Sequence, residues 1–163
     1  EIARACVEMS RVRTGALIVV AQNDSLSEYE STGIGVDGIV TSQLLINIFE
    51  KNTPLHDGAV IIKGDRVTSA TCYLPLSDNS QLSKALGTRH RAGIGISEAT
   101  DSLTLIVSEE NGMISAAYKG ELKRGLSQQD IEELLARIQN KTTEDKKLRL
   151  WKGWAKNEKK ANS

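Results

Sequence analysis

Residues 55–74, LHDGAVIIKGDRVTSATCYL, contain two strand-like runs separated by a tight turn. The first run, residues 59–62, is apolar and largely β-branched, and strand-type residues return over 66–74. Lys63-Gly64-Asp65 between the two runs has the composition of a short hairpin turn. This stretch therefore predicts a β-hairpin, with the polar pair Asp57-Gly58 at its entrance.

Further strands and helices alternate on both sides of this hairpin. Short apolar runs predict buried strands at residues 15–20, 103–107 and 113–118, the last two joined by a turn at Glu110-Asn111-Gly112. Gly33, Gly35 and Gly38 mark a loop with room for one short strand. Helices are predicted over residues 1–13, 26–31, 42–49 and 81–86, from 88 past 96, and from 127 onward. The alternation indicates an α/β domain.

Capping residues set the expected helix starts. Thr41 or Ser42 is expected to cap the helix that ends before Asn52-Thr53-Pro54. Thr88 is expected to cap the helix predicted from residue 88 past 96. Ser127 is followed three residues later by Asp130, the spacing of a capping box. If Thr88 caps its helix, the motif around it occupies the first helical turn.

Composition narrows the class of protein. The 163 residues are 39% hydrophobic and 26% charged with zero formal net charge, as in one globular domain, and 4% aromatic residues leave little for nucleic-acid stacking. Cys6 and Cys72 lack metal or redox spacing and are expected to be reduced thiols. The longest aliphatic run, residues 16–21, is too short to cross a bilayer, and the first residue is Glu. We expect a soluble domain excised from a longer protein.

The composition shifts at residue 141. Residues 141–163 are rich in Lys, Asn and Glu with isolated apolar side chains, a pattern typical of a flexible charged tail. Leu148, Leu150, Trp151 and Trp154 also permit an amphipathic helix on a membrane or partner, which composition favours less. We expect a domain over residues 1–140 and a tail over 141–163.

Both histidines lie in compact polar motifs. Residues 55–59, LHDGA, place an imidazole and a carboxylate beside a glycine, which suits a metal ion or a hydroxyl group. Residues 87–91, GTRHR, place a hydroxyl and two guanidinium groups at a predicted helix start, which suits phosphate oxygens. Together they indicate metal-assisted phosphoryl or nucleotidyl chemistry.

Simpler interpretations of each motif stay open. Asp57-Gly58 is also an ordinary turn, and Glu109-Glu110 is also a solvated hairpin end rather than a pair of metal ligands. Basic side chains at the start of a helix are unfavourable beside the positive end of its dipole unless an anion binds there. The residues alone therefore predict an α/β domain that binds a phosphorylated ligand and a divalent metal.

Residues 1–140 closely resemble the diadenylate cyclase catalytic domain, a family that condenses two ATP molecules into cyclic di-AMP and pyrophosphate. The resemblance is greatest to the membrane-type members of the family. It rests on an ordered set of motifs, residues 57–59 (DGA) and 89–91 (RHR), supported by 15–19 (GALIV), 72–77 (CYLPLS) and 107–110 (VSEE). It implies a central mixed, largely antiparallel β-sheet flanked by helices, which agrees with the alternation above.

The resemblance also implies roles for individual residues. It places Asp57, Gly58, Arg89 and His90 at the catalytic centre, with Asp57 binding metal and helping to activate the ribose 3′-hydroxyl. Gly58 would allow close backbone approach, so that a side chain there should clash. The ATP site would comprise Leu17, Gly58, Tyr73, Leu74, Thr88, Arg89, Arg91, Ser108 and Glu110. The metal site would comprise Asp57 with His56, Glu109 and Glu110, and would take Mn²⁺ or Mg²⁺, or else Co²⁺.

In the family, two domains meet face to face as a homodimer, and each 3′-hydroxyl attacks the α-phosphate of the other ATP. The resemblance further implies that the full-length protein lies at the cell membrane with this domain in the cytoplasm. It implies a membrane-anchored regulatory protein and a phosphoglucosamine mutase as partners, and no nucleic-acid partner. The alternative function is a non-catalytic nucleotide-binding scaffold. The presence of both Asp57 and Arg89 argues against this alternative.

Overall fold

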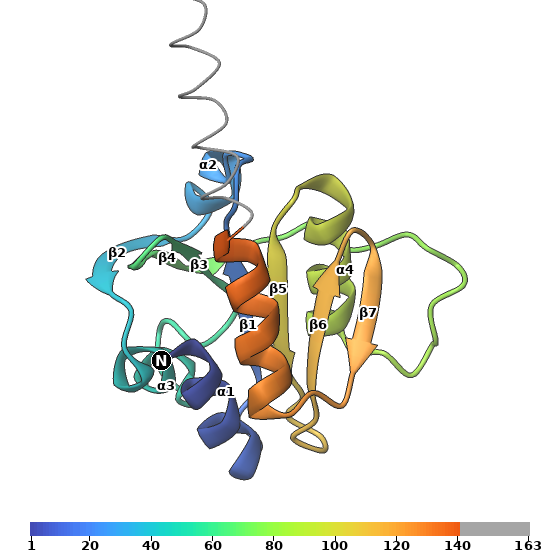
Figure 1. Ribbon diagram of the computed structural model, residues 1–163, viewed down its shortest axis with the longest axis horizontal. Coiled ribbons are helices and arrows are strands. Elements are labelled where there is room, and N and C mark those ends of the chain that lie inside the picture. Colours follow the sequence, from blue (N-terminus) through green and yellow to red (C-terminus); the bar gives the residue numbers. More distant parts are fainter. Residues whose placement is uncertain (141–163) are drawn as a thin grey trace, which may run out of the picture.

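The computed structural model describes residues 1–140, which form one seven-stranded sheet with helices on both faces (Figure 1). The strand order is β2-β4-β3-β1-β5-β6-β7. The strands are β1 (Ala16–Val20), β2 (Ile34–Ile39), β3 (Ala59–Lys63), β4 (Arg66–Cys72), β5 (Leu103–Val107), β6 (Ile114–Tyr118) and β7 (Glu121–Arg124). The helices are α1 (Ile2–Arg11), α2 (Ser27–Glu30), α3 (Ser42–Phe49) and α4 (Thr88–Ala99), followed by a helix over residues 128–140.

The central strand β1 makes the sheet mixed. It runs parallel to β3, with Ile18 opposite Val60, and antiparallel to β5, with Ile18 opposite Leu105. The remaining neighbours, β2–β4, β3–β4, β5–β6 and β6–β7, are all antiparallel. The predicted mixed, largely antiparallel sheet flanked by helices is confirmed.

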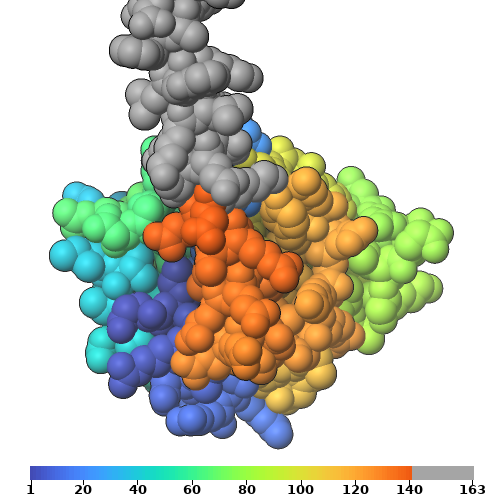
Figure 2. All heavy atoms as spheres, in the orientation of Figure 1, coloured from blue at the N-terminus to red at the C-terminus, as the bar shows by residue number. Residues whose placement is uncertain are grey.

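Each face of the sheet buries its own apolar cluster. One cluster packs beneath α1, α3 and the helix at 128–140, and includes Phe49, Leu105 and Ile131. The other packs beneath α4, and includes Leu17, Ile94 and Ile106. Figure 2 shows the first face covered by α1 and the 128–140 helix, while Figure 1 places α4 on the far side. The split follows from the two-residue period of the strands, which sends successive side chains to opposite faces.

Most of the predicted elements are confirmed within one or two residues, including two caps. Thr41 Oγ1 accepts the Leu44 N–H at 3.0 Å. Ser127 and Asp130 exchange two side-chain to backbone bonds of 2.9 and 3.1 Å, which forms the expected capping box. Gly112 has φ +73° in the turn between β5 and β6, as a tight turn requires.

Two helix predictions are wrong. Residues 81–86 form turns rather than a helix, because Asn79 and Ser83 bond nearby backbone N–H groups and stabilise turns instead. Thr88 does not cap α4: it is the first helical residue, and Gly87 occupies the cap position without any side-chain bond. The N-terminus of α4 is therefore left without a side-chain acceptor.

The sequence analysis also missed β7. Lys119 and Gly120 both have positive φ, at 49° and 80°, which turns the chain tightly after β6. The returning strand has a mostly exposed pattern because it is a polar edge strand, so it carries no apolar alternation.

Cys6 and Cys72 are buried free thiols, so the expected reduced state agrees with the structure. Within residues 1–140, no helix is long and apolar enough to span a membrane. The predicted tail at 141–163 lies outside the described residues.

Candidate active site

One edge of the sheet gathers chain segments that are far apart in the sequence. β1 and β3 begin there, and β4, β5 and β7 end there, because β1 pairs parallel to β3 and antiparallel to β5. Beside this edge lies a cavity of about 860 Å³. Its lining includes nearly all of the predicted site residues, among them Leu17, His56, Asp57, Gly58, Tyr73, Leu74, Thr88, Arg89, His90, Ser108, Glu109 and Glu110.

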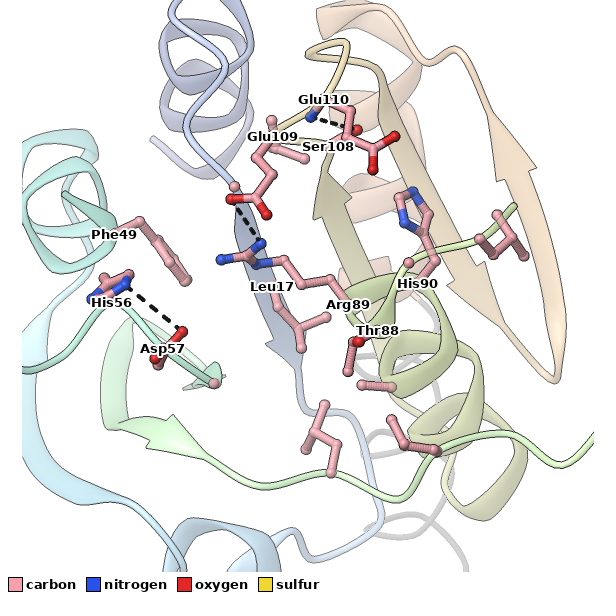
Figure 3. A pocket seen from close by; sticks show the side chains of 18 of the residues that line it. Leu17, Phe49, His56, Asp57, Thr88, Arg89, His90, Ser108, Glu109 and Glu110 are labelled. Carbon is pink, nitrogen blue, oxygen red and sulfur yellow. Dashed lines mark hydrogen bonds and ion pairs between the residues drawn. The ribbon is translucent and has the colours of Figure 1, made fainter. Parts of the chain in front are cut away.

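Figure 3 shows that the cavity has two walls, which we call the acidic wall (His56 and Asp57) and the basic wall (Thr88, Arg89 and His90). The acidic wall lies in the loop that leads into β3, and the basic wall is the first turn of α4. Leu17 on β1 lies between the two walls, and Ser108 and the two glutamates follow β5. The topology thus brings together the two motifs that the sequence separates.

The acidic wall is held by few contacts. The Asp57 side chain is 86% exposed, and its one ion-pair contact within residues 1–140 is with His56, whose Nε2 lies 3.7 Å from Asp57 Oδ1. The other ring nitrogen, Nδ1, lies 2.7 Å from the Thr53 carbonyl oxygen and must donate to it, which leaves Nε2 of a neutral ring as an acceptor. Two acceptors therefore face one another, an arrangement that favours a shared cation.

At Gly58 the backbone passes close to the end of β4. Its φ is +86°, and a Cβ there would lie 2.8 Å from the Cys72 carbonyl oxygen and 3.0 Å from Thr71 Cα. The predicted clash of a side chain is therefore with the end of β4. Gly58 lets the hairpin close beside Asp57, and so fixes where that carboxylate lies.

The basic wall begins at an open helix end. Gly87 is extended, with φ −74° and ψ 175°, and no side chain caps α4. The first intrahelical bond runs from the Arg91 N–H to the Gly87 carbonyl at 3.2 Å, so the N–H groups of residues 88–90 have no partner within the helix. Together with the positive end of the helix dipole, these groups form a site that suits phosphate.

Arg89 is the most closely held side chain of the basic wall. Its guanidinium crosses Gly15 so tightly that a Cβ on Gly15 would lie 2.7 Å from Cζ. Nη1 of Arg89 also lies 3.4 Å from Glu109 Oε2, and the Arg89 side chain is 25% exposed. Packing and charge together aim the guanidinium into the cavity.

His90 is buried, and burial lowers the pKa of its imidazole. The positive charges of Arg124 and Arg89 lower this pKa further, while Glu110 acts in the opposite direction. The ring is therefore neutral at pH 7 and can donate one hydrogen bond. Its neutral state is what allows a third basic residue beside two arginines.

The remaining predicted residues divide into three groups. Ser108 Oγ accepts the Glu110 N–H at 3.2 Å, which shapes the turn after β5. Tyr73 is 76% exposed at the cavity mouth, near Leu74. Arg91 is not part of the cavity lining, and its Nη2 instead donates to the Ser83 carbonyl at 3.2 Å, which anchors the loop before α4.

Sequence reasoning missed several residues that line this site, and three of them bear on its chemistry. Gly15 supports Arg89, Phe49 lines the cavity from the end of α3, and Arg124 lines it from the end of β7. Gly15 opens the motif GALIV, but nothing in the sequence indicates which side chain crosses it. Arg124 carried no signal because its strand was not predicted.

Comparison with known proteins finds relatives that cover most of this chain. The chain is 49% identical over 150 residues to cyclic di-AMP synthase CdaA of Bacillus subtilis, covering 92% of this chain and 55% of the relative. It is 57% identical over 127 residues to a diadenylate cyclase of Listeria monocytogenes, covering 78% and 46%. The chain thus spans about half the length of the curated relatives it matches.

The fold agrees with the sequence matches. The crystal structure of DacA from Staphylococcus aureus superposes with a TM-score of 0.82 at 49% identity, covering 84% of this chain and 91% of that one. A hypothetical membrane spanning protein from Bacillus cereus gives 0.75 at 43% identity, covering 77% and 61%. The model of the family described as DisA bacterial checkpoint controller nucleotide-binding (DAC) matches residues 3–122, and both walls of the cavity lie within that match. The chain belongs to this DAC family.

Proposed function

We propose that this chain is the catalytic domain of a diadenylate cyclase, which condenses two ATP molecules into cyclic di-AMP and two pyrophosphates. The observation that carries the proposal is the single cavity that contains both the exposed Asp57 carboxylate and the uncapped N-terminus of α4 with Arg89. Relatives named as a cyclic di-AMP synthase and as a diadenylate cyclase support the same activity.

In this proposal the basic wall holds the triphosphate. The N–H groups of residues 88–90, the Thr88 hydroxyl and the Arg89 guanidinium all offer donors to phosphate oxygens, and Ser108 adds a hydroxyl from the turn after β5. Leu17 and Leu74 supply apolar contacts for the adenine, and the exposed Tyr73 ring can stack on it. Arg89 then stabilises the negative charge that grows as pyrophosphate departs.

The family's chemistry calls for a divalent metal, and the acidic wall fits one. Within residues 1–140, no group of three His, Cys, Asp or Glu side chains can hold a metal by itself. Asp57 and His56 provide two acceptors, and Mg²⁺-like ions are commonly bound by one or two carboxylates together with substrate phosphates. We propose Glu109 and Glu110 as further ligands only for a metal that is already held against substrate phosphates, because within residues 1–140 they do not group with Asp57 and His56. The metal, Mn²⁺, Mg²⁺ or Co²⁺, would neutralise charge on the reacting phosphate.

Asp57 also accepts the proton of the attacking ribose 3′-hydroxyl. We propose that the hydroxyl belongs to the nucleotide of a second subunit, placed face to face with the first, so that each 3′-oxygen displaces pyrophosphate from the other α-phosphate. A homodimer places the reacting atoms at high effective concentration, which a lone subunit cannot do. A lone subunit should therefore bind ATP without turning it over.

The extent and setting of the domain are also proposals. Residues 1–140 would form the catalytic domain, and the full-length protein would lie at the cell membrane with this domain in the cytoplasm. A membrane-anchored regulatory protein and a phosphoglucosamine mutase are the partners that the family resemblance implies.

Incubation of the purified chain with ATP and Mn²⁺, followed by chromatography, tests the activity. We expect cyclic di-AMP and pyrophosphate, with a rate per subunit that rises with protein concentration where dimerisation is limiting. ATP binding without product at any protein concentration would instead support the non-catalytic scaffold. A rate per subunit that is flat over a wide range would contradict a transient dimer and favour a preformed one.

A further inference from the structure

Arg124 ends β7 and lines the same cavity as the basic wall, yet the proposed reaction has so far given it no role. The register of β6 and β7 places it directly opposite Ser115. Two residues along, the pair Ala117 and Leu122 packs in the cluster beneath α4. Since strand side chains alternate between faces, Ser115 and Arg124 lie on this same face. Arg124 therefore lies on the side of the sheet that carries the cavity.

The charge of Arg124 is not neutralised by the protein. Within residues 1–140, Arg89 pairs with Glu109, whereas no carboxylate forms an ion pair with Arg124. Arg124 is exposed, and its positive charge helps to lower the pKa of the His90 imidazole at the start of α4. An unpaired guanidinium is stable only beside water or an anion, so this end of the cavity suits negative charge.

The strand order shows which part of a nucleotide lies here. Arg124 is on β7, three strands away from Leu17 on β1. Neighbouring strands are roughly 4.8 Å apart, so the two backbones are separated by about 14 Å across the sheet. Helix α4 packs mainly on β5 and β6, the two strands that lie between β1 and β7. A nucleotide with its base on Leu17 and its phosphates at α4 thus directs its last phosphate toward β7.

We propose that Arg124 binds the terminal phosphate of the nucleoside triphosphate and makes the site prefer triphosphates to diphosphates. The proposal rests on the proposed function, because it takes the orientation of ATP from it. The guanidinium donates hydrogen bonds to the γ-phosphate oxygens, which a diphosphate lacks. The same contact remains with pyrophosphate as it leaves.

The test compares Arg124→Gln with Lys123→Gln. Lys123 is the matched control because it precedes Arg124 on the same strand, is exposed, faces the other side of the sheet, and does not line the cavity. Titration calorimetry with a non-hydrolysable ATP analogue and with ADP, both with Mg²⁺, gives the ratio of the two affinities. We expect Arg124→Gln to weaken binding of the analogue about 10-fold and that of ADP less than threefold. Lys123→Gln should change neither affinity.

Three results would overturn the proposal. An unchanged ratio in Arg124→Gln, or an equal loss for both nucleotides, would mean that the guanidinium does not recognise the terminal phosphate. Arg124→Lys keeps the positive charge, so it should retain part of the preference for the ATP analogue over ADP that Arg124→Gln loses. If Arg124→Lys has the thermal midpoint of the parent but no such preference, the proposal is also wrong. If the parent chain binds neither nucleotide, the proposed function itself fails. If the parent binds both and the ratio does not change, only this inference fails.

Discussion

The two walls of the cavity are built in different ways. On the basic wall, the Arg89 side chain is only 25% exposed, packs over Gly15 and pairs with Glu109. On the acidic wall, the Asp57 side chain is 86% exposed and, within residues 1–140, has only His56 within ion-pair distance, at 3.7 Å. The protein thus fixes its cationic groups in advance, whereas the carboxylate gains its full set of partners only from what binds. Substitutions on the basic wall should therefore weaken ATP binding as well as turnover, whereas loss of the Asp57 carboxylate should reduce turnover with little change in ATP affinity.

The largest effect is expected for Asp57→Asn. The amide keeps the shape but can neither accept the hydroxyl proton nor bind metal well, so product formation should fall by about 10²- to 10⁴-fold. ATP affinity and thermal midpoint should stay close to those of the parent, because the side chain is exposed and makes few contacts. Rate and calorimetric affinity measured on one preparation check this.

Asp65→Asn is the control for that variant, because Asp65 is exposed in the turn at the far end of the same hairpin. It should retain the parent rate. Full activity in Asp57→Asn would remove Asp57 from the reaction, and a large loss of ATP binding would contradict the division between the walls.

Gly58→Ala should reduce the free energy of unfolding by about 2 kcal/mol, because the new Cβ meets the end of β4 and φ is +86°. Gly64→Ala is the matched control: its φ is +62°, but a Cβ there meets nothing within 4 Å. It should lose only about 1 kcal/mol, from the backbone alone. Urea unfolding measures both. Equal losses would show that the contact with β4 has no cost.

Gly15→Ala should weaken ATP binding by about 10-fold, roughly the value of one charge-assisted hydrogen bond, because a Cβ displaces the Arg89 guanidinium. Gly35→Ala serves as the comparison, since no atom lies within 4 Å of a Cβ there. Titration with ATP in the absence of turnover measures the loss. Wild-type affinity in Gly15→Ala would mean that Arg89 can bind phosphate from a second position.

The smallest effect concerns pH. The pKa of His90 is lowered from 6.5 in the folded state by burial and by Arg124, with Glu110 opposing, so below pH 6.5 the unfolded chain binds more protons than the folded chain. Stability should therefore fall as pH drops through 6.5 toward the folded pKa. His90→Gln should lose this part of the slope, and His56→Gln should retain it. Urea unfolding from pH 5 to 8 compares the three proteins, and identical slopes would contradict the assignment.

Local chemistry explains what the sequence predicted well. The strands at β1, β3 and β5 are short apolar runs, and the cap at Thr41 and the capping box at Ser127 need only neighbouring residues. The helix predicted over 81–86 was wrong because polar side chains there bond the backbone in turns. β7 was missed because pairing with β6, rather than its own composition, makes it a strand.

The site was predicted in part for the same reason. Asp57 and Arg89 lie in recognisable motifs, and the family resemblance predicts that both belong to one site. Gly15 and Arg124 depend on which strands become neighbours, and a short motif does not contain that information. The roles of these two residues therefore could not be predicted without the strand order.

The central position of β1 has a consequence for the way the chain folds. Among the strands of this sheet, β1 is synthesised first, and both of its hydrogen-bonding edges stay open until β3 and then β5 follow. Its sequence, ALIVV, is apolar and uncharged, which is typical of segments that aggregate when exposed. Refolding at high protein concentration should therefore give aggregates that form through this strand. Nascent chains that end before residue 103 should need chaperone protection.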